Sequence, residues 1–129
     1  MNEHKHKDRR KYPRLEKKLP IKAFGETFDF YTETMNIGAG GVLFYLDNPI
    51  PIATKLKITL VLPSKKEKKD IKIDCEGVVV RIQENLTVTG QGRYYMAIMF
   101  TEISPENRAK INQFVNEQLG ISEGEEEGD

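Results

Sequence analysis

Three arginines and a lysine fall within seven residues near the N-terminus, in the run Asp8–Arg14, before any segment with the composition of a β-strand. Pro13 disfavours a helix here, and it pushes Tyr12 toward extended geometry. Each guanidinium is a planar, permanently charged fork that can hold a phosphate or the O6/N7 edge of a guanine with two hydrogen bonds. The segment is therefore an extended or turning arm, and it is either solvated or a binder of an anionic ligand.

The length of the chain and its few special residues limit what the protein can be. With 129 residues it forms one domain with a core of its own. No apolar run approaches the roughly 20 residues that span a bilayer, and the N-terminus lacks the apolar core of a signal peptide. Cys75 is the single cysteine, so no internal disulfide can form. We expect a cytoplasmic protein without membrane insertion.

The charge is unevenly distributed although the formal net charge is +0. Residues 1–22 carry nine Lys or Arg and three acids, whereas residues 117–129 carry six acids and no base. A basic head indicates an anionic partner, and an acidic end indicates a solubilising tail. We expect a mobile segment over residues 1–8, a folded domain over 9–120 and a disordered acidic tail over 121–129.

The pattern of apolar residues predicts six strands followed by one helix. The strands are expected at residues 19–24, 28–35, 42–46, 55–62, 71–82 and 93–101. Gly77 predicts a bulge or bend within the fifth of them. Ser104 is a helix N-cap, and an apolar stripe through Ile111, Phe114 and Val115 predicts a helix that ends at Gly120. Strands without crossover helices indicate a mainly β fold, an antiparallel sheet or barrel onto which the helix docks.

A glycine-rich connection, Asn36-Ile37-Gly38-Ala39-Gly40-Gly41, joins the second and third strands. It leads into a strand and not into a helix, so it is not a dinucleotide-binding fingerprint, and it lacks the Gly-Lys-Ser/Thr of a P-loop. Glycines let the backbone approach a ligand closely. The connection is either a tight turn or the floor of a binding site.

The arm and the glycine-rich connection together resemble the signature of the PilZ domain family. That signature is Arg-x-x-x-Arg followed by Asp/Asn-x-Ser-x-x-Gly, and here it reads Arg10-x-x-x-Arg14 and Asn36-x-Gly38-x-x-Gly41. The resemblance covers about residues 9–119. It implies a six-stranded antiparallel split β-barrel with a C-terminal helix, and binding of cyclic di-GMP, a bacterial second messenger.

The resemblance also implies the residues of the site. Arg10 and Arg14 would grip the phosphates and guanine edges, and Arg9 would join them. Asn36, Gly38 and Gly41 would line the floor. The family's serine is Gly38 here, and loss of one neutral hydrogen bond would weaken binding by about 0.5–1.5 kcal/mol. Arg81 is either a solvated strand residue or an extension of the positive surface.

Two functions follow from the resemblance and a third from the arm alone. The first is a cyclic di-GMP receptor, a monomer or weak dimer, that changes its contacts with an unidentified effector protein. The second is a degenerate adaptor that binds no nucleotide and acts through protein contacts, for instance in motility or pilus machinery. The third, an RNA- or single-strand-binding barrel, is disfavoured by the zero net charge. We therefore expect no nucleic acid polymer as a partner.

The sequence offers no constellation for catalysis. Both histidines, His4 and His6, lie in the N-terminal segment, and the three serines lie in a predicted loop, a helix cap and the tail. No acid–base pair or metal-ligand spacing is present. We expect no catalytic residues, no metal and no cofactor other than the nucleotide ligand.

Overall fold

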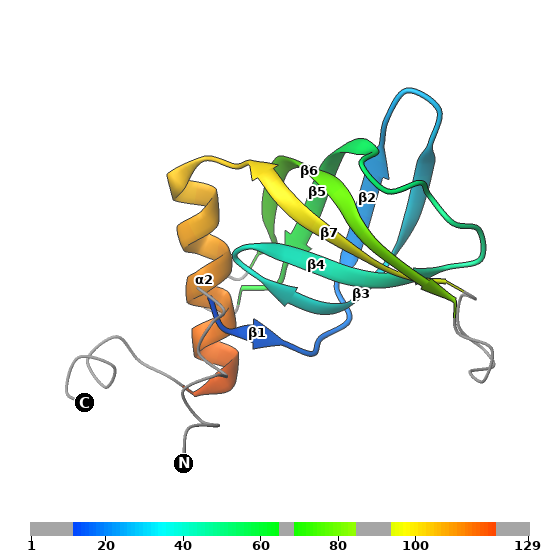
Figure 1. Cartoon of the computed structure of the whole chain (residues 1–129). Coiled ribbons are helices and arrows are strands. Elements are labelled where there is room, and N and C mark those ends of the chain that lie inside the picture. Colours follow the sequence, from blue (N-terminus) through cyan, green and yellow to red (C-terminus); the bar gives the residue numbers. More distant parts are fainter. Residues whose placement is uncertain (1–11, 65–68, 85–93, 121–129) are drawn as a thin grey trace, which may run out of the picture.

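The computed structural model describes residues 12–64, 69–84 and 94–120, which form seven strands and one helix (Figure 1). The elements are β1 (Arg14–Leu15), β2 (Pro20–Phe24), β3 (Asp29–Gly38), β4 (Gly41–Leu46), β5 (Lys55–Leu62), β6 (Ile71–Glu84), β7 (Tyr94–Glu102) and α2 (Pro105–Leu119).

Six of the strands close into an antiparallel barrel. The strand order is β1-β3-β2-β5-β6-β7-β4, and β4 also pairs with β3, which closes the ring. All seven pairings are antiparallel. The predicted six-stranded antiparallel barrel with a C-terminal helix is confirmed, with β1 as an extra short strand.

The short strand β1 pairs with the same edge of β3 as β2 does, but farther along β3. Arg14 pairs with Gly38 and Leu15 with Ile37, while β2 pairs with residues 29–33 of the same strand. The chain leaves the sheet between β1 and β2, and the fully buried Thr34 holds it there. The Thr34 hydroxyl donates to the Lys17 carbonyl oxygen at 2.7 Å and accepts from the Leu19 N–H at 3.1 Å. The start of the chain is thereby attached to β3.

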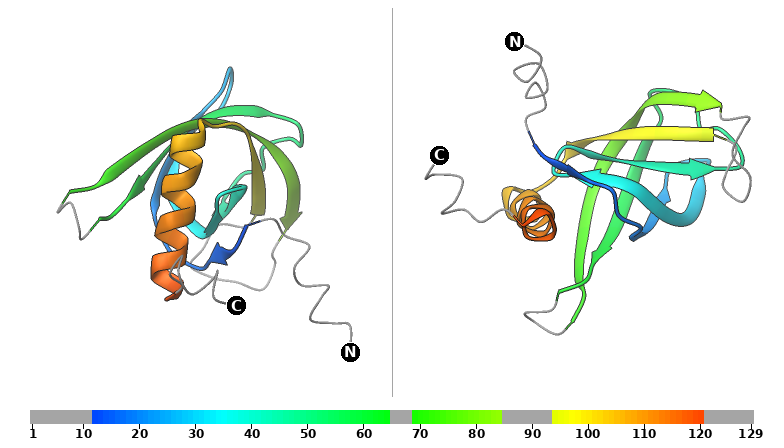
Figure 2. Two further views of the ribbon diagram at one scale, coloured as in Figure 1. Left: turned by 90° about the vertical axis from the view of Figure 1, so that its left-hand side faces the viewer. Right: turned by 90° about the horizontal axis from the view of Figure 1, so that it is seen from below.

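Alternating side chains from every long strand fill the barrel. The fully buried residues include Phe44 of β4, Leu60 of β5 and Ile73 of β6. The helix α2 lies across one end of the barrel and contacts β1, β3 and β6 (Figure 2). Its residues Ile111 and Val115 are fully buried, so its apolar stripe closes that end.

The ends of α2 form as predicted. The Ser104 side chain accepts a hydrogen bond from the Asn107 N–H at 3.0 Å, which satisfies one of the free donors of the first turn. Gly120 adopts a left-handed conformation with φ 81°, and its N–H bonds to the end of the helix.

The predicted elements agree with the structure except around the two signature motifs. The bulge at Gly77 is confirmed by a register shift between Glu76 and Gly77. The turn predicted over residues 36–41 is wrong in extent: β3 continues through Gly38, and only residues 39 and 40 connect it to β4. Strand pairing on both edges of Gly38, to Arg14 and to Gly41, extends β3 that far. The predicted loop through Arg14 is likewise a strand at its end.

Candidate ligand-binding groove

A groove of about 570 Å³ runs along the outside of the barrel, between the β3–β4 hairpin, strands β6 and β7, and the start of α2. We call it the arginine groove. Its lining residues are Tyr12, Arg14, Asn36, Gly38, Gly40, Gly41, Val42, Leu43, Val80, Arg81, Ala97, Ile98, Met99, Phe100 and Arg108. Three arginines of the described residues therefore line one hollow.

Four of the six residues predicted for the site line this groove. They are Arg14, Asn36, Gly38 and Gly41, which come from β1, β3 and β4. Arg9 and Arg10 lie outside the described residues. Pairing of β1 with β3 brings Arg14 beside the hairpin although 24 positions separate Arg14 from Gly38.

One β-bulge turns Asn36 toward the groove. The register of β3 against β4 shifts between Thr34 and Asn36. Thr34 and Ile37 are both fully buried although they are three residues apart, so the two residues between them occupy the outer face. Regular alternation would have turned Asn36 inward with Thr34.

A second bulge presents Val80 and Arg81 in the same manner. The register of β6 against β7 shifts between Val79 and Arg81. Val79 is buried and Ile82 packs against the core, so both residues between them project outward into the groove. Arg81, which the sequence left undecided, is therefore part of the positive surface.

Two glycines of the motif are required by close backbone approaches. A Cβ on Gly41 would collide with the carbonyl oxygen of Ile98 in β7, so only glycine lets β4 lie this close to its neighbour. A Cβ on Gly38 would lie 2.8 Å from the Pro13 carbonyl oxygen and 3.3 Å from Cγ of Arg14. The position that holds the family's serine thus has no room for a side chain while β1 is paired.

The groove is electrostatically one-sided. Among the described residues, its lining contains Arg14, Arg81 and Arg108 but no carboxylate. None of these three guanidiniums forms an ion pair with a carboxylate within the described residues. Uncompensated cations in a hollow attract an anion, and guanidinium forks match phosphate oxygens and guanine edges.

Sequence reasoning missed Arg108 and the role of Tyr12. Nη1 of Arg108 donates to the Tyr12 hydroxyl at 3.2 Å, and its guanidinium carbon lies 5.5 Å from the centre of the Tyr12 ring. A Cβ on Gly40 would lie 3.6 Å from that ring, so Tyr12 stands between α2 and the β3–β4 hairpin. The available signal was the position of Arg108, three residues before the buried Ile111 and hence on the apolar side of the helix.

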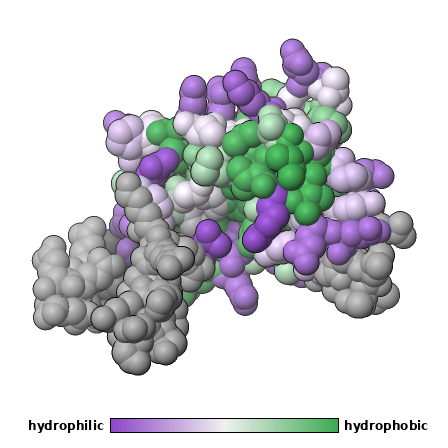
Figure 3. Space-filling view, viewed as in Figure 1, coloured by the Kyte–Doolittle hydropathy of each residue, from purple (hydrophilic) through white to green (hydrophobic). Residues whose placement is uncertain are grey.

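The remaining wall of the groove is apolar. Val80 and Met99 are 44 % and 50 % exposed, and both lie in the groove. Leu43 and Ala97 lie beside them on β4 and β7. Figure 3 shows a hydrophobic area over β4, β6 and β7 with hydrophilic side chains next to it. The groove can therefore accept flat apolar faces as well as charge.

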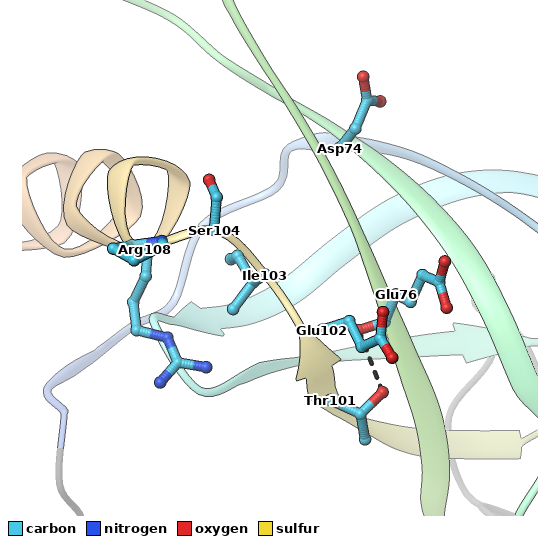
Figure 4. A pocket seen from close by; sticks show the side chains of 8 residues that line it. Asp74, Glu76, Thr101, Glu102, Ile103, Ser104 and Arg108 are labelled. Carbon is cyan, nitrogen blue, oxygen red and sulfur yellow. Dashed lines mark hydrogen bonds between the residues drawn. The ribbon is translucent and has the colours of Figure 1, made fainter.

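A second hollow, of about 630 Å³, lies on the other side of Arg108 and has the opposite charge (Figure 4). Asp74, Glu76 and Glu102 line it together with the N-terminal end of α2. Within the described ranges no three His, Cys, Asp or Glu side chains are grouped so as to hold a metal ion. Repulsion makes this hollow unsuitable for a phosphate.

Cys75 is buried in the barrel. Removal from water, with a smaller contribution from the neighbouring carboxylates of Asp74 and Glu76, raises the pKa of its thiol to about 12. A thiol that stays protonated is a poor nucleophile.

Comparison with protein families settles the class of the domain. The PilZ domain model matches residues 8–117, which is most of the chain. The chain belongs to the PilZ family. This is a family of cyclic di-GMP receptors and adaptors without catalytic activity, and the resemblance seen in the two motifs is confirmed.

One solved structure shares the fold over most of this chain. The inhibitor of motility MotI/DgrA from Bacillus subtilis superposes with a TM-score of 0.75 and 24% sequence identity, over 88% of this chain and 53% of that one. A tetrameric PilZ protein from Xanthomonas campestris gives a TM-score of 0.49 and 9% identity, over 74% of this chain and 52% of that one. The chain thus spans about half the length of these solved chains. No curated protein matches the sequence.

One further observation concerns membranes. The helix of the described residues is too short and too polar to cross a bilayer.

Proposed function

We propose that this PilZ domain is a cytoplasmic receptor for cyclic di-GMP and that the arginine groove is its binding site. The observation that carries the proposal is the convergence of Arg14, Asn36, Gly38 and Gly41 in one groove. The described residues that line this groove include three arginines and no carboxylate. The ligand carries two phosphodiester charges and two guanines. Both groups are partners for an arginine fork.

Each part of the groove has a role in this proposal. Arg14 binds a phosphate or a guanine edge from the β1 side, and Arg9 and Arg10 of the arm contribute in the same way. The side chain of Asn36 hydrogen-bonds the ligand from the floor. Gly38 and Gly41 contribute through their backbone, because neither position has space for a side chain.

Binding of the ligand would be transmitted as a change in protein contacts. The arm closes over the nucleotide on a rigid barrel, a local ordering of the kind that many receptors use. The output is then recognised by an effector protein, with this domain as a monomer or weak dimer. The solved PilZ relative described as an inhibitor of motility makes motility machinery one place to search for the effector.

Isothermal titration calorimetry with cyclic di-GMP tests the proposal, with GTP as the control ligand. We expect saturable binding of cyclic di-GMP alone. Replacement of Arg10 and Arg14 with alanine should weaken it, because one bidentate contact to a guanine contributes about 1–3 kcal/mol, or roughly five- to 150-fold in affinity. Lys57→Ala, which removes an exposed cation from β5 outside the groove, is the matched control. Unchanged affinity in the arginine variants would contradict the proposal.

One observation favours an alternative, in which the domain binds no nucleotide and acts only as an adaptor. Gly38 lacks the serine hydroxyl of the family signature. Under this alternative the titration gives no heat and no binding even at high protein concentration. The search would then turn to protein partners of the apolar wall of the groove.

A further inference from the structure

The side chain of Arg108 lacks the pairing expected of a structural arginine. Its Nε is buried and has no hydrogen-bond partner within the described residues. Its one side-chain hydrogen bond there is to the neutral hydroxyl of Tyr12. A partly buried cation with a free donor is costly to keep unless something completes it. Of the four N–H donors on Nη1 and Nη2, the described residues use one, and the others can donate to an acceptor in a hollow beside the side chain.

The direction of the side chain indicates which hollow holds that acceptor. Arg108 lies between the arginine groove and the second hollow, which contains Asp74, Glu76 and Glu102. It lines both. Figure 4 shows its guanidinium apart from the carboxylates of Glu76 and Glu102, with no hydrogen bond to either. An arginine required only for folding would gain most by pairing with those acids. Within the described residues Arg108 pairs with none of these acids, and the described lining of the arginine groove, which it also lines, holds cations and no carboxylate.

We propose that Arg108 is a ligand-contacting residue, the cation by which helix α2 binds cyclic di-GMP from the side opposite the hairpin. This inference rests on the proposed function of the groove. Arg108 donates to an acceptor of the ligand, either a phosphodiester oxygen or the O6/N7 edge of a guanine. The Tyr12 ring lies between the helix and the hairpin, and the bound nucleotide contacts both elements.

The contact gives the receptor a route from nucleotide to helix. Arg14 and Arg81 belong to the sheet, whereas Arg108 belongs to an element that closes one end of the barrel. A ligand held by both restrains α2 against β1 and β3. An effector protein can therefore recognise the ligand-bound state by the position of α2 or by its reduced mobility.

Four variants test the contact by calorimetry with cyclic di-GMP. Arg108→Ala should weaken binding about tenfold or more, because charge-assisted hydrogen bonds are the strong ones. Lys110→Ala removes an equal charge from an exposed position of the same helix and should change affinity less than twofold. Arg14→Ala reports on the groove itself. Arg108→Lys distinguishes the two possible acceptors on the ligand. Lysine retains part of the affinity for a phosphate, but it cannot make a bidentate contact with a guanine.

Hydrogen exchange supplies a measurement that a merely structural role would not change. In the wild type, saturating cyclic di-GMP should protect the amides of residues 106–119 as well as those of the β3–β4 hairpin. Arg108→Ala, saturated with ligand, should lose the protection of the helix and keep that of the hairpin. If alanine lowers the ligand-free melting temperature, Arg108→Met repeats the test with the aliphatic stem still covering Tyr12.

The outcomes distinguish two failures. If Arg108→Ala binds as Lys110→Ala does while Arg14→Ala binds weakly, the inference is wrong and the groove stands. If the wild type does not bind cyclic di-GMP, or Arg14→Ala binds as the wild type does, the proposed function of the groove fails and the inference with it.

Discussion

Substitution of Gly38 by serine would restore the family signature, and the structure predicts that it impairs binding. The loss of the hydroxyl alone suggests the opposite, since a regained neutral hydrogen bond is worth about 0.5–1.5 kcal/mol, or roughly three- to tenfold in affinity. The surroundings of Gly38 decide between the two expectations. This residue pairs with Arg14, which itself lines the groove.

The steric cost can be worked from the contacts. A new Cβ at residue 38 lies 2.8 Å from a backbone oxygen, that of Pro13, whereas ordinary contacts begin near 3.4 Å. The chain must therefore move by roughly half an ångström, and such overpacking costs about 1–3 kcal/mol. The two strands involved are β1 and β3. Because β1 has only two residues, whereas β3 is part of the barrel, we expect β1 to move. Displacing β1 displaces Arg14.

We expect Gly38→Ser to bind cyclic di-GMP about three- to tenfold more weakly than the wild type, because the steric cost of the new side chain exceeds the gain from the hydroxyl hydrogen bond. Gly38→Ala isolates the cost of the Cβ and should bind no better than Gly38→Ser. Calorimetry gives the affinities, and hydrogen exchange of residues 12–17 without ligand should rise in both variants. Tighter binding by Gly38→Ser with β1 still protected would refute this reasoning.

Two further predictions concern stability. Thr34→Val keeps the shape of the side chain but leaves the Leu19 N–H and the Lys17 carbonyl without their partner, so the free energy of unfolding should fall by about 1–3 kcal/mol in urea denaturation; an unchanged value would mean that water replaces the hydroxyl. The pKa of the Cys75 thiol, raised to about 12 from 9.0, predicts a stability contribution that is complete below pH 9 and is lost as the pH rises toward 12. The stability difference between wild type and Cys75→Ala should therefore shrink from pH 8 to pH 10.5, and a constant difference would contradict the burial of a neutral thiol.

The strands and helix were predictable because each has a simple period. The alternation in Lys55–Leu62 gave both bounds of β5 correctly. The N-cap at Ser104 and the left-handed Gly120 fixed the bounds of α2, since each residue type has a strong positional preference. These signals are local, and local signals can be read from a sequence.

The composition of the groove was predictable only in part. Asn36 and Gly41 could be assigned because the family signature names them. The orientation of Arg81 depends on a bulge, which changes which residues face outward and leaves no reliable mark in the sequence. The short strand β1 depends on pairing with Gly38 across 24 positions, so its extent follows from tertiary contacts that no periodicity reports. Arg108 depends on where the helix docks.

The opposite charges of the two hollows beside Arg108 restrict how a dianionic ligand can lie. A phosphate that moved from the arginine groove past the start of α2 would approach Asp74, Glu76 and Glu102 and be repelled. The same phosphate on the hairpin side lies among Arg14, Arg81 and Arg108. The ligand should thus be confined between the hairpin and the helix, with its bases toward the apolar wall at Val80 and Met99. In the proposed binding mode the hairpin and the helix both hold the ligand, so its binding and the position of α2 are coupled.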